Sequence, residues 1–258
     1  MKFPFLLATL VIATGAPGAA LADTPAKRDV VTFHASVRVE VDATGKPVKV
    51  EAPRDLPEAV RGIIERRVAS WQYQPGKIGG VPQAATTYVA VNACAAPVAE
   101  GYRLGVDFDG NGPRVAGDQR LMPPVYPSLA RRTGMEAEFK LILGIQTDGS
   151  AVIDEIKQGD VSRRMGKAVA RNAFEMELRR WVKTLRFDPE VVAGKPVREQ
   201  VGVPVSFVID HRVDRQALKE SLQAEAKASR ECQLASDASD MKPVVLQPAV
   251  AVIPTPAG

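Results

Sequence analysis

One stretch of the sequence carries oxygen-rich side chains at spacings that suit a metal ion. Asp107, Asp109, Asn111 and Gly112 occupy positions 1, 3, 5 and 6 of a calcium-loop pattern, and Asp118 falls at position 12, where glutamate is usual. No helical pattern flanks the stretch, and a hairpin turn rich in glycine and asparagine accounts for the same residues without metal. We therefore expect no bound metal here and no cofactor elsewhere in the chain.

The other reactive side chains lack the partners that catalysis needs. His34 and His211 have no cysteine, serine or carboxylate at the spacing of a metal site or a catalytic triad, so both are interpreted as surface residues. Glu175 and Glu177 are two residues apart on an expected helix and do not face each other. No glycine-rich loop could cradle a phosphate. These patterns argue against an enzyme and against a small-molecule substrate.

The first residues indicate an export signal. Lys2 precedes an apolar run over 5–13, and the segment ends in Ala20-Leu21-Ala22, the form that signal peptidase reads. The run is far shorter than the roughly 20 apolar residues of a membrane span. We expect a signal peptide over 1–22 and no transmembrane span after its cleavage. An uncleaved membrane anchor is the alternative.

Export changes how the two cysteines are interpreted, because the destination is oxidising. Cys94 and Cys232 have no third thiol to compete with, so we expect a disulfide between them. Such a bond would close a long loop and stabilise the fold by about 4 kcal/mol in the chain-entropy model. Two unpaired cysteines are the alternative.

The elements that must position these residues are clearest in the second half of the chain. Apolar residues there share one face of a helix, and after two turns others alternate as in a strand that covers a core with one face. The helical set is Phe174, Leu178, Trp181, Val182 and Leu185, and the strand set is Val201, Val203, Val205, Phe207 and Ile209. A helix packed on a sheet is the expected result.

The same pattern occurs earlier in the chain. Subtracting 114 maps apolar positions onto apolar ones, aromatic onto aromatic, glycine onto glycine and proline onto proline. The pairs are Phe174 with Val60, Leu178 with Ile64, Val182 with Val68, Leu185 with Trp71, Phe187 with Tyr73, Pro189 with Pro75, Gly194 with Gly80, and Pro196 with Pro82. Before the helix the offset is 104, as Gly149 and Gly45 show. The chain is therefore interpreted as an internal duplication.

Each repeat is expected to run strand, strand, helix, strand. Alternating residues over 33–42, a turn at 43–46 and a returning strand predict a hairpin in the first repeat, and Asp148-Gly149 marks the equivalent turn in the second. The expected fold class is α+β: two tandem β-β-α-β domains, at 30–96 and 121–211, plus a C-terminal helix. Each domain is expected to be a three-stranded antiparallel sheet with a helix packed on it.

The remaining segments are interpreted as connections and tails. Residues 97–120 are expected to form a linker with room for an extra hairpin, because Tyr102, Leu104, Val106 and Phe108 alternate like an extra strand. Residues 212–236 are expected to form a helical tail. Over 237–258 four prolines interrupt the sequence, which predicts a disordered tail, with a partner-binding segment as the alternative. The formal charge of +4 comes without a dense block of lysine and arginine, which argues against a nucleic-acid partner.

The order and spacing of these motifs resemble the C-terminal domain of TonB, well over about 123–209 and more weakly over about 33–92. The motifs are Pro124-Val125-Tyr126-Pro127, the Asp148-Gly149 hairpin, a helix with Trp181, Phe187-Asp188-Pro189, Gly194-Lys195-Pro196 and a valine-rich strand ending at Phe207. The resemblance implies a β-β-α-β fold that binds an extended receptor segment along the edge of its last strand. The family couples inner-membrane energy to outer-membrane receptors.

Several residues depart from the family pattern. Val125 stands where glutamine is usual, Ala137 replaces a glycine, and the first repeat has no Tyr-Pro pair. The uncleaved membrane helix and the long proline-rich spacer of the energy-transducing member are not seen either. What the resemblance implies is a periplasmic protein that binds extended segments of envelope or outer-membrane transport proteins, with a link to energy-dependent transport. The alternative is an envelope scaffold whose two domains pair with each other.

The partner-binding residues are expected on the last strand of each repeat and at the Tyr-Pro motif. Pro204 interrupts the last strand of the second repeat, whereas the equivalent Ala90 of the first does not. An incoming strand is therefore expected to pair with the first repeat over 86–92, unless the second repeat is already docked there. The candidate residues are Thr86, Thr87, Tyr88, Val89, Ala90, Val91 and Asn92, together with Val125, Tyr126, Pro127, Val203 and Val205.

Overall fold

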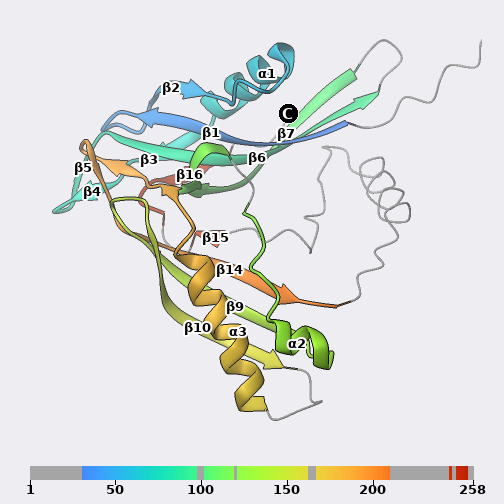
Figure 1. The fold of residues 1–258 in the computed structure, drawn as a ribbon. Coiled ribbons are helices and arrows are strands. Elements are labelled where there is room, and N and C mark those ends of the chain that lie inside the picture. The colour runs from blue at the N-terminus through green and yellow to red at the C-terminus, as the bar shows by residue number, and fades with distance from the viewer. Residues whose placement is uncertain are drawn as a thin grey trace, which may run out of the picture.

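The computed structural model describes residues 31–97, 102–118, 121–161, 167–209, 244–245 and 248–254. The expected signal peptide over 1–22, the expected helix over 212–236 and Cys232 lie outside these residues. The described chain is an α+β structure made mostly of strands (Figure 1). In these residues, no helix combines the length and the apolar character that a bilayer crossing requires.

The first unit consists of β1 (Val31–Val41), β2 (Pro47–Glu51), α1 (Glu58–Ala69) and β6 (Ala85–Pro97). Strand β1 lies between β2 and β6 and pairs antiparallel with both. Two more strands join the other side of β6, namely β7 (Tyr102–Gly112) and β12 (Val191–Val192). With β13 (Lys195–Pro196) next to β12, the sheet has six strands rather than the three expected from the sequence.

The core of the first unit forms between the buried face of the sheet and the buried face of α1. Val37 and Val39 of β1 are fully buried, as are Ile64 and Val68 of α1, whose four-residue spacing places them on one helical face. Trp71 closes the helix end and is 3% exposed. Alternate β-branched residues favour the strand and leave its other face for polar side chains.

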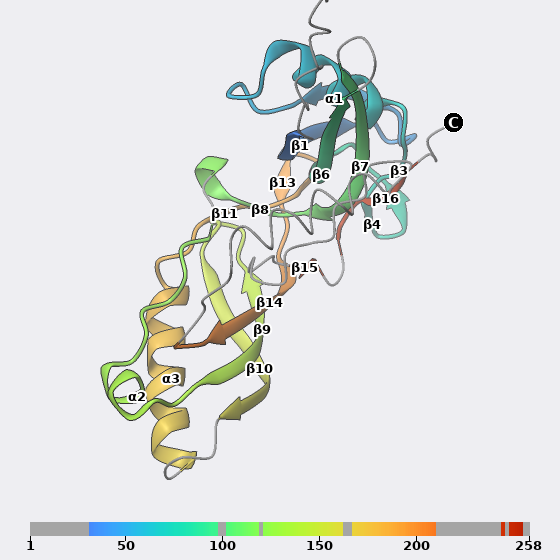
Figure 2. The ribbon, with the colours of Figure 1, turned by 90° about the vertical axis from the view of Figure 1, so that its right-hand side faces the viewer.

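The second unit repeats this arrangement with different lengths. It consists of β9 (Ala137–Ile145), β10 (Ala151–Val161), α3 (Lys167–Val182) and β14 (Glu199–Phe207), with strand order β10-β9-β14-β15, where β15 is Val244–Val245. A short helix, α2 (Ser128–Thr133), precedes β9 and ends at Gly134 in the left-handed conformation. Figure 2 shows the two units at opposite ends of the molecule with short strands between them.

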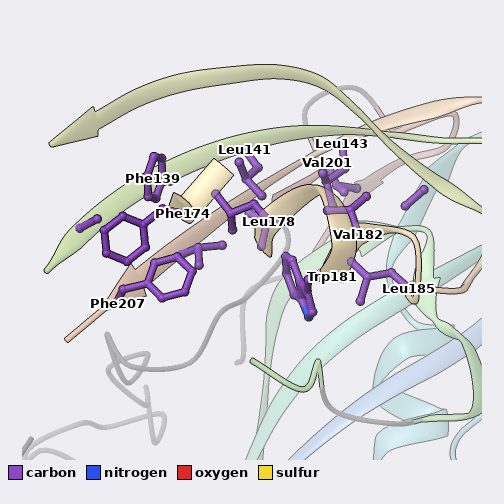
Figure 3. Close-up of a cluster of buried hydrophobic side chains, with 14 of the residues drawn as sticks. Phe139, Leu141, Leu143, Phe174, Leu178, Trp181, Val182, Leu185, Val201 and Phe207 are labelled. Atoms are coloured by element: carbon purple, nitrogen blue, oxygen red, sulfur yellow. The ribbon is translucent and has the colours of Figure 1, made fainter. Parts of the chain in front are cut away.

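Large side chains of α3 fill the space over β9 and β14 (Figure 3). Phe174 and Leu178 are fully buried, and the ring of Phe174 lies 4.8 Å from that of Phe207, measured between centroids. Leu141 and Val203 face the same helix from neighbouring strands and are also fully buried. This core is one continuous cluster, so β14 is held firmly on its inner face and along its β9 side.

Short elements connect the units. β3 (Gln72–Gln74) pairs with β16 (Ala251–Ile253), and β8 (Arg114–Val115) pairs with β11 (Phe187–Asp188). β4 (Lys77–Ile78) and β5 (Val81–Pro82) form a separate hairpin, and η1 is a short 3-10 turn over Ala116–Asp118. Each of the first two pairings joins residues that are far apart in the sequence.

The first hairpin of each unit turns at a glycine for the same reason. A Cβ added to Gly45 would lie 2.1 Å from the carbonyl oxygen of Tyr73, and one added to Gly149 would lie 2.2 Å from that of Phe187. Both glycines also have positive φ, at 86° and 79°. Glycine is therefore required twice, at positions 104 residues apart, where the hairpin meets the strand after the helix.

Residues 102–112 form strand β7, in the region where an extra strand was expected, and β7 pairs antiparallel with β6. Asp107, Asp109 and Asn111 therefore lie within a paired strand, so the expectation of a hairpin turn at these residues is wrong. The tail expected to be disordered over 237–258 forms strands at 244–245 and 251–253. Strands pair because their backbone groups find partners, and prolines at the ends of such short stretches do not prevent this.

Candidate interaction site

The strand expected to bind a partner is not an edge strand. From Thr86 to Asn92, β6 pairs with β1 on one side along its whole length. On the other side it pairs with β12 at Thr86 and with β7 from Tyr88 onward. Its donors and acceptors are therefore used within the chain, and the expectation of a free edge here is wrong. Sequence reasoning missed this because the alternation over 102–108 indicates an extra strand but does not show which strand it pairs with.

The available edge is on the second unit instead. β14 pairs with β9 over its full length, from Glu199 to Phe207. Its outer side pairs with β15 only at Val201 and Gly202. In the described part of the chain, no strand pairs with the outer side of residues 203–207. This outer edge of β14 is the candidate interaction site.

Pro204 sets the hydrogen-bonding pattern of this edge. Its register partner on β9 is Lys140, and proline has no N–H to donate. The pairing with β9 keeps all its hydrogen bonds only if the Pro204 nitrogen faces away from β9. Because the backbone groups of alternate residues in a strand point to the same side, we infer that Gly202, Pro204 and Ser206 direct theirs to the outer edge. Where β15 does not cover it, that edge then offers the carbonyl acceptors of Pro204 and Ser206 but lacks the donor of Pro204.

The side chains on β14 divide by face. Val203 and Val205 are buried at 0% and 1% exposure under α3, so neither side chain is available to a partner. Pro204 and Ser206 are exposed on the opposite face. A partner at this edge would therefore be held by backbone hydrogen bonds, with side-chain contacts on the outer face.

The Tyr-Pro motif lies against the far end of the same strand. The ring of Tyr126 packs edge-on against Phe207, with 5.5 Å between centroids, and its hydroxyl donates to the carbonyl oxygen of Met135 at 2.5 Å. Pro127 is buried at the start of α2, whereas Val125 is 72% exposed. Tyr126 therefore supports the core, and Val125 is the member of the motif that a partner could touch.

The C-terminal tail crosses from the second unit to the first. After β15 covers Val201 and Gly202, the N–H of Ala249 donates to the carboxylate of Glu190. Val250 is fully buried in the core of the first unit, and its carbonyl oxygen accepts a bond from the Asn111 amide at 2.6 Å. β16 then adds to β3. We call the described tail residues, 244–245 and 248–254, the strap.

Two buried carboxyl groups lie at the foot of the strap. Glu190 is 0% exposed and Glu199 is 4% exposed, and the N–H of Glu190 donates to Glu199 Oε2 at 3.1 Å. Burial raises the pKa of Glu199 to about 9, and the nearby carboxyl of Glu190 adds to the effect. At neutral pH Glu199 is therefore protonated and can donate to Glu190, which allows both groups to stay buried.

The hairpin β12–β13 joins the two units. Val192 is 3% exposed and belongs to the core of the first unit, although it follows α3 in the sequence. The hairpin β4–β5 lies 114 residues earlier, and its Ile78 and Val81 are 51% and 58% exposed. The two hairpins have the same spacing but opposite environments.

The remaining candidate residues do not gather into a site. In the described residues no group of three histidine, cysteine, aspartate or glutamate side chains is placed to hold a metal ion. His34 shares a 2.7 Å hydrogen bond with the Asn92 amide across β1 and β6. Cys94 is buried in β6, and because Cys232 lies outside the described residues, the disulfide stays a prediction.

Sequence reasoning missed the strap and the buried carboxyl pair. Glu190 and Glu199 lie on either side of a glycine turn and look like ordinary surface charges, so only their burial distinguishes them. One sequence pattern indicated the strap: between the prolines at 248 and 254, alanine alternates with valine and an isoleucine follows. Such short stretches are ambiguous without knowledge of the edges they could join.

Comparison with known proteins relates one region of this chain to TonB. Over 93 residues the chain is 33% identical to Protein TonB of Pseudomonas aeruginosa (strain PAO1), a match that covers 36% of this chain and 25% of TonB. The chain is also similar to the solution NMR structure of the Pseudomonas aeruginosa TonB C-terminal domain, with 31% identity, coverage of 36% of this chain and 86% of that one, and a TM-score of 0.26. No family model matches. The chain thus contains a TonB-like region and spans a quarter of that relative's length.

Proposed function

We propose that this is a periplasmic interaction protein that binds extended segments of envelope or outer-membrane transport proteins along the outer edge of β14. The observation that carries the proposal is the outer side of residues 203–207, which no described strand covers. Unpaired backbone donors and acceptors on a rigid strand are what an extended peptide needs for strand addition. The TonB-like region supports the choice of partner class and of compartment.

We also propose that both units are TonB-like domains that arose by duplication. Each has a hairpin, a helix and a last strand that pairs with the first, in the same order. The glycine turns at Gly45 and Gly149 contact equivalent carbonyl groups, and the hairpins β4–β5 and β12–β13 are 114 residues apart. Among the described residues, only the second unit keeps part of its last strand uncovered, so we assign partner binding to it.

The proposal is of binding rather than of catalysis. Glu190 and the protonated Glu199 are buried beneath the strap, where their hydrogen bonds stabilise the fold. An energy-dependent role in transport is a further part of the proposal, and it requires that the bound segment belong to a transport protein. Cleavage of residues 1–22 and recovery of the mature chain in a periplasmic fraction would support the compartment.

Site-specific photo-crosslinking in cells tests the proposed edge. A photo-reactive amino acid at Ser206, on the exposed face of β14, is expected to capture an envelope protein. The matched control places it at Val152, which is 43% exposed on β10 at the opposite edge of the same sheet. Capture at Ser206 but not at Val152 supports the proposal. Equal capture at both positions, or none at Ser206, contradicts it.

One observation favours the alternative of an envelope scaffold. The two units pair within the chain, since Val191 and Val192 of β12 join the edge of β6. This pairing covers only the start of the outer side of β6, which β7 covers from Tyr88 onward, whereas the outer side of β14 is partly uncovered in the described residues. A scaffold would bring the units together and bind nothing at β14, so absence of capture at Ser206 in cells selects it.

A further inference from the structure

The tail strand β15 occupies the place where a partner strand would begin to pair. It is antiparallel to β14, with Val245 opposite Val201 and Val244 opposite Gly202. Its other neighbour is β7 of the first unit. An incoming strand that follows the outer edge of β14 from residue 207 toward residue 199 therefore meets the tail at Gly202.

The ladder between β14 and β15 is short. Only two residue pairs form it, and in the sequence Val244 and Val245 lie between Pro243 and Pro248. Proline cannot donate to a ladder, so the prolines limit how far this pairing can extend. Two residue pairs supply few hydrogen bonds, each of which contributes only modestly in water, so β15 holds the edge weakly by itself.

The strap is anchored elsewhere. Ala249 donates to Glu190, Val250 is fully buried in the first unit, and β16 pairs with β3 over three residues. Glu190 also contacts Glu199, the first residue of β14, but Val250 and β16 are held by the first unit, and all these contacts lie only a few residues beyond Val245. They keep β15 at a local concentration that for a short tether is on the order of millimolar, even when its pairing opens.

Resting on the proposed function, we propose that the tail is a built-in competitor for the outer edge of β14, which a partner strand must displace. The partner fitted to this edge is an extended segment without proline that carries adjacent β-branched apolar residues, like Val244 and Val245. The partner strand displaces the tail because it can also pair with residues 203–207, whereas the tail pairs only with Val201 and Gly202.

The experiment compares full-length variants of the tail. Val244→Pro with Val245→Pro removes both backbone donors of β15, whereas Val244→Thr with Val245→Thr keeps the donors and the β-branched shape. The probe is a fluorescent peptide that copies residues 241–250 with valine in place of both prolines. Binding is followed by fluorescence anisotropy, and hydrogen exchange is followed at the amides of Val201 and Gly202.

The proline variant is expected to lose protection at Gly202 and to bind the probe at least roughly tenfold more tightly than the parent, because the edge is no longer pre-occupied. The threonine variant should behave like the parent. Unchanged protection, or equal probe affinity for the parent and the proline variant, overturns this inference and leaves the proposed function standing. Loss of protection with no probe binding to any variant overturns the proposed function, and this inference with it.

Discussion

Two residues of β14, Pro204 and Glu199, set the hydrogen bonds that its outer edge can make and the charge that is buried at its start. Pro204 removes one donor from an edge, and Glu199 buries a carboxyl that must stay protonated. Pro204 stands out in the sequence because it interrupts an alternating strand, whereas Glu199 looks like an ordinary surface charge beside a turn. Their effect follows from which side of β14 each residue faces.

The protonation of Glu199 makes stability depend on pH. Its pKa is about 9 in the folded protein against 4.5 as its ordinary value, so the folded state binds one more proton in between. The stabilisation is fully present below about pH 4.5 and is lost as the pH rises through about 9. We expect Glu199→Gln, which can still donate to Glu190, to flatten the fall in the free energy of unfolding over this window.

Urea unfolding at roughly pH 5, 7 and 9 measures this dependence. Glu138→Gln changes an exposed carboxyl on β9 and serves as the control, which should keep the parent slope. If Glu199→Gln and the parent lose stability in parallel with rising pH, the assignment of the shared proton is wrong.

The positions Ala90 and Pro204 are equivalent by sequence offset but have opposite surroundings. Ala90 is opposite Ser36 of β1 and Gly110 of β7, so a proline there removes a bond that the chain uses. We expect Ala90→Pro to lower the free energy of unfolding by on the order of 3 kcal/mol, through the lost bond and the steric clash. Pro204→Ala should cost no more than about 1 kcal/mol, the entropy of a freer unfolded chain.

Chemical denaturation of both variants beside the parent checks this contrast. A folded Ala90→Pro protein with parent stability would mean that β6 does have a free side. Pro204→Ala provides a second readout, since it restores a donor to the outer edge of β14 and should strengthen binding of a partner strand.

At the scale of elements, the same hairpin motif is used in two ways. β12–β13 inserts Val192 into the core of the first unit, whereas β4–β5 exposes the equivalent Ile78. Val192→Ala is therefore expected to cost about 1.5–3 kcal/mol, the value of burying a valine side chain. Ile78→Ala should change stability by no more than about 0.5 kcal/mol.

Thermal and urea unfolding of these two variants give the comparison. The substitutions are matched in chemistry and in position within the hairpin, so a difference between them reports the contact between units. Similar losses for both, or a negligible loss for Val192→Ala, would show that β12 does not stabilise the first unit.

The elements themselves could be predicted from local patterns, and their partners could not. Alternation and helical periodicity located β1, β9, α3 and β14, because each buries one face of a local core. The edges depend on backbone pairing between distant segments, which leaves no period in side-chain hydrophobicity. For this reason the side of β6 that β7 covers was expected to be free, and the tail was expected to be disordered.

At the scale of the whole molecule, the strap and β12 link two units that each have a core of their own. Both links end in the same core, since Val192 and Val250 belong to one cluster with Val37 and Val89. The covered part of β14 and the core of the first unit are thus joined by a few residues of the tail. A substitution that loosens the core of the first unit is therefore expected to weaken the pairing of β15 with β14.

Loosening the anchor of the strap tests this link. Val250→Ala removes two methyl groups from a fully buried side chain and should lower the stability of the first unit by about 1.5–3 kcal/mol. Because β15 lies only five residues before Val250, the amide of Gly202 on β14 should exchange faster in the same variant.

Ile253→Ala, in the same strap but 46% exposed, is the control and should alter neither quantity. Hydrogen exchange resolved by residue gives both readouts. Faster exchange confined to the first unit, with Gly202 unchanged, would mean that the strap does not transmit between the units and that β15 pairs with β14 independently of its anchor.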